Sequence, residues 1–132
     1  MNRFIYSFVA FVLLFGFSSH AESKELITVF KGSESRTTAE FKVKAPWIID
    51  WMTTGDYPGT GAIDVHLVSS PGGQYLGKVV STRWIYNGVK LFDESGVYRL
   101  KVDSNLMNWS LRVEQLTRQE AEEYTPKALK LD

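Results

Sequence analysis

Apolar and polar residues alternate with a period of two along most of this chain, which is the pattern of β-strands that bury one face. The clearest alternating stretches are residues 39–44, 47–52, 63–68, 97–102 and 109–114. Turn-forming residues separate these stretches at intervals of about 8 to 12 residues. About eight short strands with this spacing predict an antiparallel β-sandwich or barrel and not an alternating α/β fold.

The predicted core is rich in tryptophan. Trp47, Trp51 and Trp109 fall on the inward side of their strands, and an aromatic side chain buries roughly 150 to 250 Å². The chain has no cysteine. A disulfide framework, a thiol nucleophile and a cysteine-ligated zinc ion are therefore excluded, and the core alone must stabilise the fold.

The pattern is less regular between residues 76 and 96. Leu76, Val80, Trp84 and Tyr86 share one parity, which predicts one long, bent strand or two short ones. The segment Asp93–Gly96 has the composition of a tight turn, so the strands on either side of it are expected to form a hairpin.

The N-terminus has the features of a secretory signal peptide over residues 1–21. A polar and basic start precedes an apolar run of 14 residues, from Phe4 to Phe17, and small residues at Ser19 and Ala21 favour cleavage after Ala21. A membrane anchor is the alternative, but this run is shorter than the roughly 20 residues that a membrane-spanning helix needs. We expect a periplasmic or secreted protein that is not inserted in the membrane after cleavage.

The chain after the signal is long enough for one domain. Residues 22–116 are assigned to the β-sandwich, and residues 117–132 to a short helix and a C-terminal tail. Thr117 followed by Glu120 predicts a capping box at the start of that helix, which Pro126 limits to about two turns.

The charge of the exported chain is nearly balanced. Removal of Arg3 with the signal leaves 14 basic and 15 acidic residues, and these are interspersed without a basic stripe. Nucleic acid is therefore not an expected partner.

Several segments together resemble a known kind of domain. In chain order these segments are Thr37-Thr38, Phe41-Lys42-Val43, Trp47-Ile48-Ile49-Asp50-Trp51, Gly96 to Val102, and Trp109 to Val113. The pattern, which covers about 75 residues, resembles small secreted bacterial β-sandwich domains of CUB-like or jelly-roll type, whose function is uncharacterised. The resemblance implies the fold. Every matching residue is one that a sandwich core uses for packing, so no catalytic or ligand-binding position is implied.

Three polar residues form a candidate catalytic or metal-binding site. Asp50, Asp64 and His66 all point outward from strands that are potential neighbours, so a small hydrolase or metal-dependent enzyme is one interpretation. The alternative is an ordinary solvated sheet face. His66 is the only histidine left after signal cleavage, so no second histidine completes a typical zinc site.

Aromatic residues near a glycine-rich loop give a second candidate. The loop from Thr54 to Gly61 places Tyr57 among glycines and small polar residues, a composition suited to a mobile recognition loop. Together with Tyr75, Trp84 and Tyr86, this tyrosine is a candidate platform for a sugar ring or a protein surface. The alternative is that Trp84 and Tyr86 complete the core and that Tyr57 packs on its own loop.

The sequence thus favours an exported, non-catalytic binding domain that recognises a protein, peptide or glycan. The ligand-binding candidates are Tyr57, Tyr75, Trp84 and Tyr86, and no catalytic residue, cofactor or metal ligand is predicted. The oxygen-rich segments 93–96 and 103–105 lack the long acidic spacing of a calcium-binding loop. The enzyme that would use Asp50, Asp64 and His66 remains the alternative.

Overall fold

The structure is a computed structural model, and it describes residues 24–57 and 59–124. These residues form nine strands and one short helix. In chain order they are β1 (Glu25–Gly32), β2 (Arg36–Thr37), β3 (Phe41–Val43), β4 (Trp47–Thr54), β5 (Ala62–Ser69), β6 (Tyr75–Thr82), β7 (Asn87–Phe92), β8 (Gly96–Asn105), β9 (Asn108–Gln115) and α2 (Arg118–Glu122). The predicted signal peptide, and residues 125–132 of the predicted tail, lie outside the described residues.

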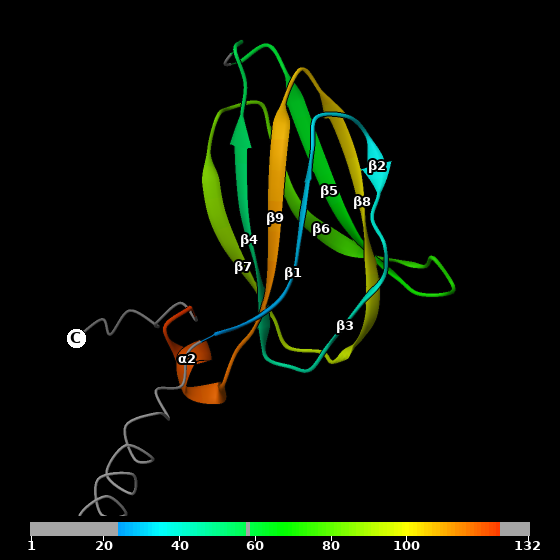
Figure 1. Cartoon of the computed structure of the whole chain (residues 1–132), viewed down its shortest axis with the longest axis vertical. Helices are drawn as coiled ribbons and strands as arrows, with labels where there is room; N and C mark the ends of the chain where they lie inside the picture. The colour runs from blue at the N-terminus through cyan, green and yellow to red at the C-terminus, as the bar shows by residue number, and fades with distance from the viewer. Residues whose placement is uncertain (1–23, 58, 125–132) are drawn as a thin grey trace, which may run out of the picture.

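The strands form two antiparallel sheets that face each other (Figure 1). Sheet 1 has the order β1-β9-β4-β7, and sheet 2 has the order β2-β8-β5-β6, with β3 also paired to β8. When β2 and β3 are counted as one interrupted strand, each sheet has four strands, and their order is that of a jelly roll. The prediction of an all-β antiparallel sandwich of about eight strands is confirmed.

Consecutive strands mostly lie in different sheets. Among the described strands, β5 and β6 are the one consecutive pair that forms a hairpin. The hairpin predicted around Asp93–Gly96 is wrong, because β7 pairs with β4 in sheet 1 whereas β8 pairs with β5 in sheet 2. This segment carries the chain from one sheet to the other.

The three predicted tryptophans lie in the core between the sheets. Trp47, Trp51 and Trp109 are all buried, and Trp47 is completely inaccessible. The Trp47 ring stacks on Phe92 at a centroid distance of 4.2 Å and on Tyr98 at 5.3 Å. Its indole N–H donates to the backbone oxygen of Glu94 at 2.9 Å. The fully buried Trp47 ring is thus both packed and hydrogen-bonded, as a buried indole requires.

The outward residue Ile48 is unexpectedly buried. The chain after β9 explains this, since it folds back over the end of sheet 1 near Pro46, where the Leu116 amide donates to the Pro46 oxygen. Helix α2 follows, and its residues line one side of a hollow whose other side is formed by Pro46 and Leu91. Figure 1 shows α2 at this lower end of the sandwich.

The start of α2 matches the sequence pattern. The Thr117 hydroxyl accepts from the Glu120 amide, and the Glu120 carboxylate accepts from the Thr117 amide, so the predicted capping box is present. No helix in the described part of the chain is long and apolar enough to span a membrane.

The position of Tyr98 gives a test of the fold at alkaline pH. Burial raises the pKa of Tyr98, and the nearby Glu94 carboxylate raises this pKa further. In the neutral form its hydroxyl donates to the Glu94 backbone oxygen at 2.8 Å. A tyrosine in the unfolded chain ionises near pH 10. The stability that Tyr98 contributes is therefore fully present below about pH 10 and is lost as the pH rises through the raised pKa of the folded state.

We expect the free energy of unfolding to fall more steeply above about pH 10 in the unmodified protein than in Tyr98→Phe. Urea unfolding at a series of pH values from 8 to 11, as approximate limits around the tyrosine pKa, measures this difference. Tyr75→Phe, at an exposed tyrosine, is the matched control and should keep the steep fall. Parallel slopes for Tyr98→Phe and the unmodified protein would contradict the assignment.

Candidate functional site

Three connections meet at one end of the sandwich, the upper end in Figure 1. They are the β4–β5 loop (55–61), the β6–β7 loop (83–86) and the β8–β9 turn (106–107). A Cβ atom on Gly61 would lie 2.6 Å from the Asn105 oxygen, and one on Gly55 would lie 3.1 Å from the Leu106 oxygen. These close approaches restrain the β4–β5 loop against the β8–β9 turn.

Thr53, which is buried near the end of β4, holds the β6–β7 loop in place. Its amide donates to the Tyr86 oxygen at 2.8 Å, and its hydroxyl accepts from the Tyr86 amide at 2.9 Å. The same hydroxyl lies 2.9 Å from the Trp84 oxygen, to which it donates. One buried side chain therefore fixes the backbone on both sides of Ile85.

The β4–β5 loop packs against the indole of Trp84 at Gly59. Gly59 has a positive φ of 81°, and a Cβ atom there would lie 3.2 Å from the Trp84 ring. The Gly59 amide donates to the Arg83 oxygen at 3.0 Å. A glycine is required at this position both for the backbone conformation and for the close approach of the ring.

The side chains on these restrained loops remain in solvent. Trp84 is 63% exposed, Ile85 44% and Tyr86 61%, and Tyr57 on the neighbouring loop is 61% exposed. The interpretation in which Trp84 and Tyr86 complete the core is therefore wrong. The Tyr86 ring also contacts the buried Trp51 ring, at a centroid distance of 5.4 Å. We call the four residues Tyr57, Trp84, Ile85 and Tyr86 the loop-end platform.

The fourth aromatic candidate, Tyr75, does not belong to this platform. It lies at the first residue of β6, seven residues before the end of that strand at Thr82, or about 23 Å at the usual rise per residue. Its ring contacts His66 at 5.4 Å on the outer face of sheet 2. Three of the four predicted residues, Tyr57, Trp84 and Tyr86, thus lie on loops at one end of the sandwich, where Ile85 is also exposed. The alternation did not reveal the exposure of Ile85.

The three polar residues proposed as a catalytic or metal-binding site do not lie together. Asp50 points outward from β4 in sheet 1, whereas Asp64 and His66 point outward from β5 in sheet 2. The two outer faces of a sandwich are separated by the core, which is about 10 Å thick between the sheets. These three residues therefore do not share a site. Among the described residues, no three histidine, aspartate or glutamate side chains gather in a metal-binding arrangement.

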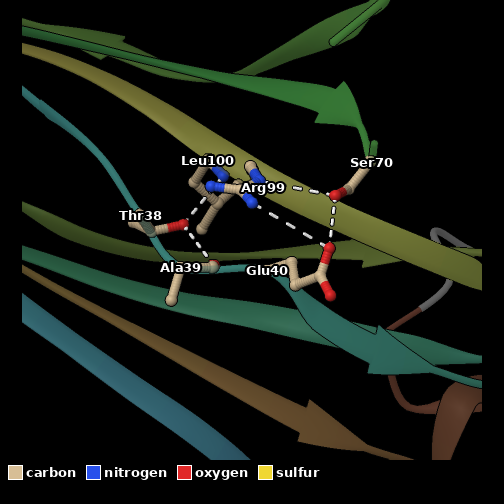
Figure 2. Close-up of polar contacts among 6 residues, drawn as sticks. All are labelled: Thr38, Ala39, Glu40, Ser70, Arg99 and Leu100. Atoms are coloured by element: carbon tan, nitrogen blue, oxygen red, sulfur yellow. Dashed lines mark hydrogen bonds and ion pairs between the residues drawn. The ribbon is translucent and has the colours of Figure 1, made fainter. Parts of the chain in front are cut away.

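The sequence also missed a polar cluster on sheet 2, shown in Figure 2. The Ser70 hydroxyl donates to the Glu40 carboxylate at 2.6 Å, and Arg99 contacts both of them, at 3.4 Å from the serine oxygen and 4.0 Å from the carboxylate. Nearby, the buried Thr38 hydroxyl accepts from the Leu100 amide at 3.0 Å.

This cluster is a structural clamp. It fastens the link between β2 and β3 to β8 and to the β5–β6 loop (Figure 2). The Ser70 hydroxyl bonds to a carboxylate and a guanidinium. This arrangement differs from the serine–imidazole pair that activates a serine nucleophile. No local sequence signal reveals the cluster, because Glu40 and Ser70 are 30 residues apart.

Comparison of the sequence with protein-family models and with curated proteins finds no match. The functional assignment therefore rests on the geometry of the loop-end platform and its surroundings.

Proposed function

We propose that this protein is an exported, non-catalytic recognition domain that binds a protein, peptide or glycan through the loop-end platform. One observation carries the proposal. Three consecutive large side chains, Trp84, Ile85 and Tyr86, are exposed on a backbone that the buried Thr53 fixes. Export is inferred from the signal-like residues 1–21.

The cost of this exposure supports a binding role. Burying a large apolar side chain contributes roughly 1.5 to 3 kcal/mol, so a loop that leaves three of them in water gives up stability. Exposed apolar surface that is not scattered along the chain often marks an interaction site, and these three exposed side chains are consecutive. Because the hydrogen bonds of Thr53 already order the backbone, a ligand that docks here loses little conformational entropy from the loop.

The separation of Asp50 from Asp64 and His66 favours recognition over the alternative enzyme. A hydrolase or metal-dependent enzyme would need these groups within one cavity. They lie on opposite outer faces of the sandwich instead.

The test compares three forms of the protein, purified after export and immobilised on beads. They are the unmodified protein, the double variant Trp84→Ala/Tyr86→Ala, and Tyr75→Ala as a matched loss of one exposed aromatic outside the platform. The probe is the mixture of extracellular proteins and polysaccharides from the cells that make the protein. Retained proteins are identified by mass spectrometry, and retained sugars by chromatography after hydrolysis.

We expect the unmodified protein and Tyr75→Ala to retain the same species, and the double variant to lose it. The retained species, once purified, should bind the unmodified protein in solution. Retention that is equal in all three forms, or that is absent from all three, would overturn the proposal.

A further inference from the structure

A polar hollow adjoins the loop-end platform on the outer face of sheet 2. Its volume is about 440 Å³, within the usual range for small-ligand sites. Residues 62–64 at the start of β5 line one side, and residues 81–84, which end β6 and begin the β6–β7 loop, line the other. Trp84 thus belongs both to the platform and to the wall of this hollow.

The hollow combines three kinds of hydrogen-bonding group. Asp64 supplies a carboxylate, which accepts from the Ser81 hydroxyl at 2.5 Å. Arg83, whose side chain carries a guanidinium, and Ser81, whose side chain carries a hydroxyl, also line the hollow. A carboxylate only accepts hydrogen bonds and a guanidinium only donates them. A ligand that satisfies both must carry groups that donate and accept within a short span.

Trp84 supplies the apolar part of the same hollow. Gly59 supports the indole on one side, and the ring remains 63% exposed. A broad ring held in this way offers a flat apolar surface beside the polar groups of Asp64 and Arg83. Ligands with one apolar face and a rim of hydroxyl groups match this surface.

The charged residues at the hollow restrict the class of ligand further. Arg83 is the one cationic residue among the described residues of the lining, whereas the Asp64 carboxylate is joined by Asp103, which pairs with it from β8. A phosphate chain would therefore meet two carboxylates beside the guanidinium. An apolar peptide segment would cover both ionic groups without bonding to them, which is costly. Vicinal hydroxyls both donate and accept, so a neutral sugar ring satisfies both groups.

We infer that the hollow beside Trp84 is the subsite of a neutral glycan. One ring stacks its C–H face on the Trp84 indole while its hydroxyls bond to Asp64 and Arg83. This inference rests on the proposed recognition function and specifies its ligand class. The rest of the platform, Tyr57, Ile85 and Tyr86, extends the contact to adjoining sugar units.

The test uses a panel of neutral oligosaccharides, which is screened for binding to the unmodified protein. Isothermal titration then measures the affinity of a bound oligosaccharide for four variants. Trp84→Ala removes the stacking surface, and Asp64→Asn removes the acceptor charge in the hollow. Tyr75→Ala and Asp103→Asn are the controls. The first removes another exposed aromatic side chain and the second makes the same Asp→Asn change, both at positions outside the hollow.

Asp103 is a close control because it pairs directly with Asp64 across β5 and β8. Opposed like charges on neighbouring strands destabilise a sheet slightly. Asp64→Asn and Asp103→Asn therefore relieve the same repulsion, and neither is expected to unfold the protein. A loss of binding in Asp64→Asn alone would be specific to the hollow.

We expect Trp84→Ala to weaken oligosaccharide binding at least about tenfold, as expected for a central aromatic contact. Asp64→Asn should weaken it severalfold, and both controls should leave it unchanged. If the panel contains no binder, or if Asp64→Asn and Asp103→Asn behave alike, the glycan subsite is overturned. If a protein is captured through Trp84 and Tyr86 while no sugar binds, only the glycan subsite fails. If substitutions in the loop-end platform change the binding of neither sugar nor protein, both the glycan subsite and the proposed recognition function are wrong.

Discussion

Trp47→Ala should lower the free energy of unfolding by about 3 to 5 kcal/mol, the range for the loss of a large buried aromatic ring. Trp47 is completely buried, stacks on Phe92 and Tyr98, and meets Phe41 edge-on at 5.7 Å. The substitution leaves a large cavity between the two sheets. It also removes one of the two donors to the Glu94 oxygen, which keeps its hydrogen bond from the Tyr98 hydroxyl.

Such a loss is a large fraction of the total stability of a small domain, which is about 5 to 15 kcal/mol. The chain has no cysteine, so no disulfide limits the effect. Urea unfolding followed by circular dichroism gives the measurement. Trp84→Ala is the matched control, because it deletes the same side chain from an exposed position and should change stability by less than about 0.5 kcal/mol. Equal losses at the two positions would contradict the assigned core.

Local pattern was sufficient to predict most of the core. Trp47, Ile49 and Trp51 alternate with outward residues, and all three are buried as expected. The strand at 109–114 behaves in the same way, with Trp109 and Leu111 turned inward. Period-two alternation works here because each of these strands buries one side against the opposite sheet.

The same reasoning fails where long-range contacts decide the structure. The parity of Leu76 and Val80 continues to Trp84 and Tyr86, but the strand ends at Thr82 and Leu76 is exposed. The backbone of Tyr86 bonds instead to Thr53, which is 33 residues away in the sequence. No pattern within the β6–β7 segment contains that information, so its aromatic residues could be proposed as a platform but not placed.

Strand pairing could not be predicted from the local sequence either. The composition of Asp93–Gly96 predicts a turn, and a short connection between β7 and β8 is present at residues 93–95, but composition does not specify which sheet receives the next strand. In a jelly roll the partners of β7 and β8 are β4 and β5, which are distant in the sequence. The clamp of Glu40, Ser70 and Arg99 is likewise a product of this pairing.

Thr53→Val should have the second large effect, since it is expected to alter both stability and recognition. Valine keeps the shape of threonine but removes the hydroxyl that accepts from the Tyr86 amide and donates toward the Trp84 oxygen. Leaving buried backbone groups unsatisfied costs about 1 to 3 kcal/mol. We expect the free energy of unfolding to fall by about that amount in urea titrations.

The β6–β7 loop should also become more mobile, because the hydroxyl fixes its backbone on both sides of Ile85. Faster hydrogen exchange at the Tyr86 amide measures this local release. Any ligand of the loop-end platform should then bind more weakly even under conditions where the variant is fully folded, because it must order the loop on binding. Thr54→Val is the matched control, one residue further along β4 at an exposed position, and should change neither stability nor exchange. If exchange at Tyr86 is as slow in Thr53→Val as in Thr54→Val, the hydroxyl does not hold the loop, and a preordered platform loses its physical basis.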